Sequence, residues 1–274
     1  MELTQFEKMD SSAWRISRGL GVYLVPISLT LAILLWQLVA VFWDFPSFIL
    51  PTPALVWDRL LKAIIDGSLL RNTLATLQEV LVGLAVGASM ATALGYLLAK
   101  SRVFERLLSP YIIASQSVPI VAIAPLLVIW FGPGIFSKVL ICALIVFFPI
   151  LVNTVVGLRS VPEELHELMR SLQATRWQTI RYLEIPASMP VFLGGLRIGA
   201  TLSVIGAVVG ELVGSDRGLG FLVNVGRGQY DTALVFVAVF TLVTLALALY
   251  GFVVLLETRL LSWRKSPDKT ISSH

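Results

Sequence analysis

Side chains that supply acid–base, nucleophilic or metal chemistry are scarce in this sequence. Its 274 residues include one cysteine, Cys142, and two histidines, His166 and His274. Cys142 lies within an apolar run, where a cysteine usually packs as a small hydrophobic residue, and neither histidine lies in such a run. A serine hydrolase needs a base within hydrogen-bond reach of its nucleophile, and a metal site needs several clustered ligands. We therefore expect no catalytic residue and no metal site, which leaves an intramembrane enzyme as a weak alternative.

The most informative spacing belongs to a polar stretch at residues 162–186, which interrupts an otherwise apolar chain. Acidic residues come first and arginines follow, an order that complements a helix dipole. Four apolar side chains recur at spacings of three and four residues, so they share one face of a helix. They are Leu165, Leu168, Met169 and Leu172. Because such a face needs a groove to fill, we expect a short helix that docks on a soluble partner; the alternative is a helix that lies back on its own bundle.

The composition places the chain among membrane proteins. Hydrophobic residues make up 57% of it, charged residues make up 14%, and the mean hydropathy is +0.85. A helix of roughly 20 residues crosses the hydrocarbon core of a bilayer, and several apolar runs approach this length. They are Val22–Phe42, Val80–Ala99, Ile112–Phe131, Val139–Val156, Val191–Val213 and Ala233–Leu256. We predict an all-α polytopic membrane protein with about six transmembrane helices.

The distribution of basic residues predicts the orientation of these helices. Lysine and arginine are more frequent in the segments that would share a side with the N-terminus than in the opposite segments. The positive-inside rule assigns that side to the cytoplasm, so both termini are expected there. The predicted organisation is a cytoplasmic N-terminal segment at 1–20, a transmembrane domain at 21–261 and a cytoplasmic tail at 262–274. Since this distribution accounts for the net charge of +4, no nucleic-acid partner is expected.

Two apolar runs carry a small residue at every fourth position, which lets a neighbouring helix backbone approach closely. The first stripe consists of Gly83, Gly87, Ala91 and Gly95, and the second consists of Gly195, Gly199, Ser203 and Ala207. Both runs should therefore be packed inside the bundle. Glu211 is the next residue on the second stripe, so its carboxylate should face protein or water rather than lipid.

Polar side chains in and beside the apolar runs are candidates for the lining of a transport path. They are Gln116, Ser117, Thr201, Ser203 and Glu211. Each of them could instead form a hydrogen bond between helices. Prolines at positions 119, 125 and 149 remove backbone donors and can bend the third and fourth spans, which would suit a gated path.

An outer segment follows the first apolar run. It contains Leu50-Pro51-Thr52-Pro53 and then an amphipathic stretch, Ala54–Ile65. The prolines fix an extended backbone, and the leucine and isoleucine spacing of the stretch predicts a helix. We expect this helix to rest on the membrane surface; direct contact with a partner is the alternative.

Several segments resemble the membrane-spanning permease subunits of ATP-binding-cassette importers, in the group that serves nitrate, sulfonate, taurine, bicarbonate and some vitamin precursors. The resemblance rests on Leu50-Pro51-Thr52-Pro53, on Val118-Pro119 with Pro125-Leu126, on Ile129-Trp130-Phe131-Gly132 and on Phe147-Phe148-Pro149-Ile150. It extends from about Phe48 to Leu260 and implies the type I importer permease fold.

The polar stretch is similar to the cytoplasmic coupling segment of this family, which would lie between the fourth and fifth spans. Glu167-Leu168-Met169 stands at the family's Glu-Ala-Ala position, and Leu183-Glu184-Ile185-Pro186 closes the segment. Gln173 replaces the usual glycine, which puts the local backbone geometry in question. The residues that the resemblance assigns to coupling are Glu163, Glu164, Glu167, Leu168, Met169, Leu172, Gln173, Ala174 and Pro186.

The resemblance implies a set of partners for the chain. ATP and Mg²⁺ would be bound by cytoplasmic ATPase subunits, because the sequence has no phosphate loop of the form Gly-x-x-x-x-Gly-Lys-Ser/Thr. A second permease copy would complete the path, and a periplasmic or lipid-anchored solute-binding protein would deliver the cargo across a bacterial inner membrane by alternating access. The expected cargo is a small oxyanion (nitrate, a sulfonate or bicarbonate) or a molecule of the riboflavin or pyrimidine-precursor type. An ion-coupled carrier or channel without ATPase subunits is the alternative function.

Overall fold

The computed structural model describes Leu24 and residues 26–43 and 45–262, and the regular elements in this part of the chain are helices. An apolar helix at Pro26–Phe42 comes first. The labelled elements are α2 (Pro53–Ile65), α3 (Ser68–Lys100), α4 (Arg102–Gln116), α5 (Ile120–Phe131), α6 (Ile135–Arg159), α7 (Glu163–Ser171), α8 (Arg176–Thr179), a π-helix η1 (Ile180–Glu184), α9 (Ile185–Gly214), α10 (Leu219–Gly228) and α11 (Thr232–Leu260). The described residues form two compact units, one within the ranges 1–62 and 226–237 and one within 63–225 and 238–274.

The described residues contain four helices that are long and apolar enough to cross a membrane: α3, the continuous helix Arg176–Gly214, α6 and α11. The pair α4 and α5 makes a fifth candidate, bent by 93°. The predicted first span begins in residues outside the described part, and its described portion, Pro26–Phe42, is shorter than a full span. The predicted segment 1–20 and all but the first residue of the predicted tail 262–274 also lie outside the described residues. The all-helical class and four or five of the predicted spans are therefore confirmed.

The third span is not the single helix that the apolar run Ile112–Phe131 predicts. The chain ends α4 at Gln116 and resumes helix at Ile120, after Ser117, Val118 and Pro119. Pro119 cannot donate a backbone hydrogen bond, and it disfavours helical geometry at the residue before it. Pro110, Pro125 and Pro149 remain inside α4, α5 and α6. Of these four prolines, only Pro119 lies at the break between α4 and α5.

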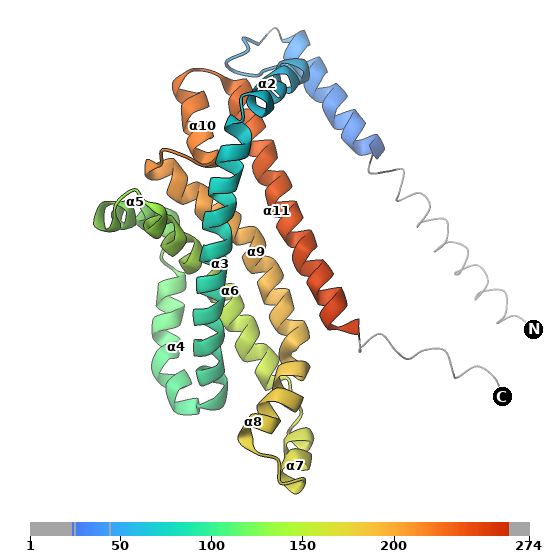
Figure 1. Ribbon diagram of the computed structural model, residues 1–274, viewed down its shortest axis with the longest axis vertical. Coiled ribbons are helices and arrows are strands. Elements are labelled where there is room, and N and C mark those ends of the chain that lie inside the picture. Colours follow the sequence, from blue (N-terminus) through green and yellow to red (C-terminus); the bar gives the residue numbers. More distant parts are fainter. Residues whose placement is uncertain (1–23, 25, 44, 263–274) are drawn as a thin grey trace, which may run out of the picture. The chain divides into compact units, whose positions relative to one another are not determined.

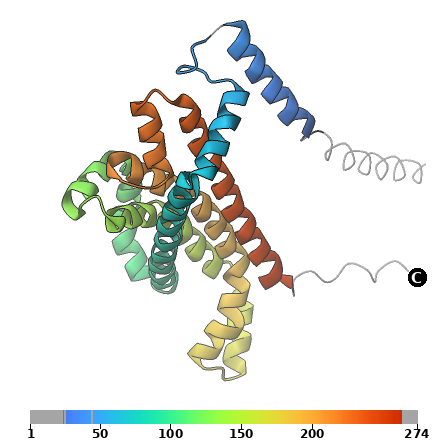
Figure 2. The same ribbon diagram turned by 45° about the horizontal axis from the view of Figure 1, so that its top comes forward.

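The core of the larger unit is built around α6, which packs between the small-residue stripes of α3 and α9. Figures 1 and 2 both show these three helices side by side. Gly83 of α3 and Gly206 of α9 both face Cys142 of α6, and a Cβ built on Gly206 would lie 2.8 Å from the Cys142 Cα. Gly87 meets Val146, and Gly199 meets the Ile150 side chain. The prediction that both stripes are buried in the bundle is confirmed, as is a packing position for Cys142.

The smaller unit is held by polar and aromatic contacts. Arg59 of α2 pairs with Asp231 at 2.6 Å, and Thr232 donates a hydrogen bond to the Phe48 carbonyl. The indole of Trp36 stacks on Phe236 with ring centroids 5.2 Å apart. The helix predicted at Ala54–Ile65 is present as α2, whereas its position on a membrane surface stays a prediction.

Candidate functional site

The short helix α7 presents its apolar stripe to the outside of its own chain. None of its residues is buried, and Leu168 and Leu172 are 53% and 67% exposed. Glu163 and Glu164 lie in the first turn and Arg170 in the last, so the charges follow the helix dipole. Figures 1 and 2 show α7 and α8 projecting beyond the ends of α3 and α6. The predicted amphipathic helix therefore exists, and the described part of the chain leaves Leu165, Leu168 and Leu172 of its apolar face exposed while Met169 is half-buried.

A tight turn ends α7 at the position where the family usually has glycine. Gln173 has φ +54°, in the left-handed region, and the Ala174 N–H donates to the Met169 carbonyl over 3.0 Å. The Gln173 N–H donates to the Arg170 carbonyl over 2.9 Å. This pair of bonds is the Schellman arrangement that commonly closes a helix at a glycine. The backbone thus keeps the glycine geometry although the residue is glutamine.

The chain re-enters helix directly after this turn. Thr175 caps α8 through a reciprocal capping box with Gln178, in which the Thr175 N–H donates to the Gln178 side chain over 2.7 Å. Pro186 has no N–H to donate to the carbonyl four residues earlier and its ring crowds that carbonyl. The helix widens into η1 just before it, and the Ile185 N–H reaches back to the Ile180 carbonyl. Arg176–Gly214 nevertheless continues as one helix of 39 residues.

Glu184 connects the polar segment to the rest of the unit. Its side chain is almost fully buried, and Oε1 accepts a hydrogen bond from Lys100 at the end of α3 over 2.6 Å. The Nε2 atom of His166 on α7 lies 3.6 Å from the same oxygen. Glu184 thus joins the end of α3 to the helix that continues into α9, and His166 of α7 lies beside this contact.

A second polar group of residues lies deep in the unit, at the opposite end of α3. Lys138 of α6 donates to Glu79 of α3 over 2.9 Å and to the Ser215 hydroxyl over 2.6 Å. The side chains of this ion pair are 2% and 3% exposed. The other carboxylate oxygen of Glu79, Oε2, has no hydrogen-bond partner among the described residues.

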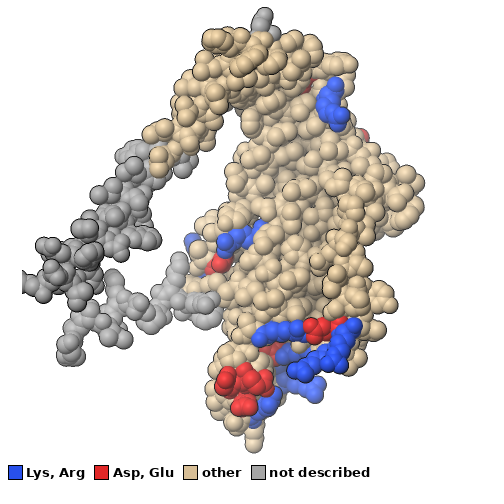
Figure 3. Space-filling model, turned by 180° about the vertical axis from the view of Figure 1, so that it is seen from behind, with Lys and Arg blue, Asp and Glu red and all other residues tan. Residues whose placement is uncertain are grey.

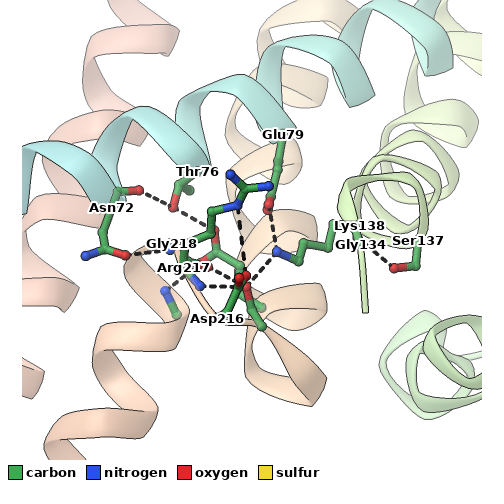
Figure 4. A network of polar contacts seen from close by, with 12 residues as sticks. Asn72, Thr76, Glu79, Gly134, Ser137, Lys138, Asp216, Arg217 and Gly218 are labelled. Atoms are coloured by element: carbon green, nitrogen blue, oxygen red, sulfur yellow. Dashed lines mark hydrogen bonds and ion pairs between the residues drawn. The ribbon is translucent and has the colours of Figure 1, made fainter. Parts of the chain in front are cut away.

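Glu211 anchors the turn that follows α9, and Figure 4 shows Gly218 of this turn beside Asn72 of α3. Its carboxylate accepts hydrogen bonds from Thr76 over 2.7 Å and from the Gly220 N–H over 2.5 Å. Asn72 accepts the Gly218 N–H over 2.7 Å. Gly218 has φ +109° and leaves no room for a Cβ beside the Glu211 carboxylate. These contacts fix the turn 215–220 on α3.

Comparison with known proteins relates this architecture to transport. Residues 83–262 match the family described as binding-protein-dependent transport system inner membrane component. The chain belongs to this family of ABC importer permeases. It is thus the non-catalytic membrane component of a binding-protein-dependent ABC transporter, a multi-pass inner-membrane protein whose family binds ATP on a partner ATPase.

Individual relatives agree with this assignment. The permease is 48% identical to the riboflavin transport system permease protein RibX of Chloroflexus aurantiacus, over 88% of this chain and 90% of the relative. It is 36% identical to the formylaminopyrimidine transport permease protein ThiX of Halalkalibacterium halodurans, over 85% and 95%. Its fold is similar to a chain of the inward-facing methionine ABC transporter MetNI, with a TM-score of 0.63, 20% identity and coverage of 72% of this chain and 97% of that chain.

The candidate path residues of the permease divide into two groups. Gln116 and Ser117 are exposed at the break between α4 and α5, and Thr201 is half-buried. Ser203 donates to the Ala200 carbonyl within its own helix, and both Ser203 and Glu211 are fully buried. In this conformation Ser203 and Glu211 bind protein groups and are closed to a solute.

Three polar residues of the permease have contacts that the sequence analysis missed. Lys138 lies in α6 and pairs with Glu79. Arg197 of α9 pairs with Glu257 of α11. Glu184 was regarded only as part of the segment's closing motif. Opposite charges on neighbouring spans were the available signal for Lys138 and Glu79, because an ionisable residue within a membrane span usually has a partner.

Proposed function

We propose that two copies of the permease form the solute path, that two cytoplasmic ATPase subunits grip its 162–186 segment, and that an external solute-binding protein delivers the cargo. The observation that carries this proposal is the uncovered apolar stripe of α7, which includes Leu165, Leu168 and Leu172. An amphipathic helix with such a stripe binds by laying it into an apolar groove. Glu163, Glu164 and Glu167 surround the stripe with charge that the groove of the ATPase would complement.

In the proposed mechanism the 162–186 segment transmits movement from the ATPase to the spans. The helix Arg176–Gly214 is continuous, so displacement at α8 is passed along α9 rather than absorbed in a loop. Glu184 would move with it and pull on Lys100 and His166. ATP-driven closure would bring two such segments together and open the path outward. The ATPase must bind the outward and inward states with different affinity, since only differential binding shifts a two-state equilibrium.

The proposed topology has six spans, with Pro26–Phe42 as part of the first and both termini in the cytoplasm. α7 and α8 then lie on the cytoplasmic side, where the ATPase is. The turn 215–220 lies on the outer side, where the solute-binding protein docks.

Replacement of the stripe tests the docking role. The double variant Leu168→Asp with Met169→Asp should abolish co-purification of the ATPase with the permease, because two buried carboxylates would oppose docking into an apolar groove. The matched control is Leu168→Ile with Met169→Leu, which keeps the face apolar and should keep the ATPase bound. Retained ATPase and retained transport in the aspartate variant would disprove the docking role.

We propose a planar heteroaromatic cargo, of the flavin or pyrimidine-precursor type, in preference to a small oxyanion. The names of the two relatives described above support this choice, and so does a groove of about 420 Å³ between α3, α4 and α6. Its walls include Tyr111, Phe147 and Phe148, and no charged residue lines it. Aromatic side chains can stack on a flat ring, whereas an oxyanion would need donors or cations.

Uptake into proteoliposomes that contain the whole transporter and its binding protein distinguishes the two kinds of cargo. Labelled riboflavin or formylaminopyrimidine should accumulate with ATP, and Phe148→Ala should slow accumulation more than Phe148→Tyr. ATP-dependent accumulation of taurine or nitrate, with none of the ring compounds, would contradict the proposed cargo.

A further inference from the structure

A cavity of about 680 Å³ lies at the end of the unit that carries α7. It is formed by the end of α3, the start of α4, the end of α6 and one side of α7, and five lysine and arginine side chains line it. They are Lys100, Arg102, Arg106, Arg159 and Arg170. Figure 3 shows basic and acidic side chains gathered at this end of the molecule, in its lower part. Only two carboxylates, Glu105 and Glu163, share the lining.

Two cations of this cavity take part in none of the ion pairs between the described residues. Arg159 holds Glu105 through two hydrogen bonds of 2.7 and 2.6 Å, and Arg170 holds Glu163 over 2.8 Å. Lys100 is bound to Glu184. Arg102 and Arg106 are exposed and make no ion pair with the described residues. The cavity therefore has an excess of positive charge at the start of α4.

The helix that carries these two arginines also exposes apolar side chains. Val103, Leu107 and Tyr111 follow one another at four-residue spacing on α4 and are 75%, 60% and 69% exposed. α4 forms a membrane-span candidate together with α5. An apolar strip beside paired arginines, at the end of a span, is the arrangement expected where lipid tails meet lipid headgroups.

We propose that this cavity binds the headgroup of an anionic phospholipid, with its phosphate between Arg102 and Arg106 and its acyl chains along Val103 and Leu107. Basic pockets beside spans on the cytoplasmic side bind such headgroups. Arg170 and His166 bring α7 to the wall of the same cavity. A bound lipid would thus contact both the membrane end of α4 and the helix proposed to dock the ATPase. The site requires neither the proposed cargo nor the docking of α7.

Lipid retention by the purified full-length permease tests the site. The protein is titrated in neutral detergent with phosphatidylglycerol and, separately, with phosphatidylcholine, and bound lipid is counted by native mass spectrometry. Phosphatidylglycerol should bind more tightly than phosphatidylcholine. Arg102→Gln with Arg106→Gln should weaken phosphatidylglycerol binding by about fivefold for each arginine removed, the effect of about 1 kcal/mol for each basic residue.

Two further variants separate charge from folding and location. Arg102→Lys with Arg106→Lys keeps both charges and should retain most of the lipid binding. Arg176→Gln with Arg181→Gln removes two exposed arginines from α8 and η1, outside the cavity lining, and should leave lipid binding unchanged. Equal binding of phosphatidylglycerol by the Arg102→Gln/Arg106→Gln variant and the unaltered permease would overturn the proposal.

Two further measurements, competition by inorganic phosphate and co-purification of the ATPase, distinguish the lipid from other occupants of the cavity. Millimolar inorganic phosphate should not displace phosphatidylglycerol, because phosphate alone lacks the contacts of the tails. Full displacement would reassign the cavity to a soluble phosphate ligand and overturn the lipid proposal. Loss of ATPase co-purification in the Arg102→Gln/Arg106→Gln variant, with lipid retention unchanged, would instead assign the cavity to an acidic segment of the ATPase.

Discussion

At the scale of single residues, the buried pair of Glu79 and Lys138 sets the strongest constraint. Removing two charges from water costs several kcal/mol for each ion, and mutual attraction repays this only with good geometry and further hydrogen bonds. Lys138 has a second acceptor in Ser215, whereas one oxygen of Glu79 lacks a partner among the described residues. The pair therefore contributes more to fixing the register of α6 against α3 than to the free energy of unfolding.

This view predicts that breaking the pair is worse than removing it. Lys138→Met leaves a buried carboxylate uncompensated and should destabilise the permease by about 3–5 kcal/mol. Glu79→Gln with Lys138→Met should recover most of that loss. Thermal unfolding in detergent measures both variants, and a double variant no more stable than Lys138→Met would contradict the account.

Gln173 is a position where a substitution should stabilise the local fold, by less than Lys138→Met destabilises it. A residue with a Cβ in the left-handed region is disfavoured by about 1–2 kcal/mol relative to glycine, and part of this is offset by the greater freedom of glycine in the unfolded chain. Gln173→Gly should therefore protect the Ala174 amide from hydrogen exchange more strongly, while Gln173→Val should protect it less. Equal exchange rates in the two variants would show that the turn does not strain position 173.

Part of the residue-scale detail could be predicted from sequence. The position of Glu211 on a small-residue stripe indicated a carboxylate facing protein, and it binds Thr76 and Gly220. The pairing of Lys138 with Glu79 was missed because it depends on the register between α3 and α6, which are 59 residues apart at this contact. Neither local periodicity nor charge counting fixes that register.

At the scale of helices, glycines that lie against the backbone of a neighbouring helix determine how closely the two helices pack. Gly206→Ala would place its methyl group 2.8 Å from the Cys142 Cα, so α6 and α9 must separate. We expect a loss of about 1–3 kcal/mol in the free energy of unfolding, as for other overpacked cores. Thermal unfolding measures the loss.

The matched control lies on the same helix. Gly194 has no atom within 4 Å of the position of an added Cβ, so Gly194→Ala should be neutral or slightly stabilising because alanine favours helix. Similar losses in both variants would mean that helix propensity, and not the approach of α6, determines the effect.

The break in the third span illustrates the limit of sequence reasoning about elements. Proline content indicated that bends were possible, but only Pro119 ends a helix while Pro110, Pro125 and Pro149 are accommodated. A proline within a membrane helix is tolerated when neighbouring groups satisfy the freed carbonyl. Which prolines have such neighbours depends on tertiary packing, which local sequence does not specify.

At the scale of the whole molecule, one permease chain is expected to be half of the path. Gln116 and Ser117 are exposed at the break between α4 and α5, where a second copy would complete their surroundings. Native mass measurement of the purified transporter should therefore give two permease copies for each pair of ATPase subunits. A stable, transport-competent particle with a single permease copy would contradict this stoichiometry.

The sequence could predict the type of partner that the chain binds but not the contacts that it makes with that partner. The apolar stripe at 165–172 indicated a soluble partner, and the resemblance to importer permeases implied that this partner is an ATPase. The surfaces of the ATPase and the binding protein lie in other chains, so the contacts proposed for them with Leu168 and with the turn 215–220 do not follow from this sequence.

A density map of the permease assembled with its ATPase subunits, determined by electron cryomicroscopy, tests the central claim most directly. We predict that Leu165 and Leu168 of α7 and Leu172, directly after this helix, lie in a groove of the ATPase and are shielded from water. A map of the intact, transport-competent assembly in which α7 is surrounded by solvent and touched by no other subunit would contradict it.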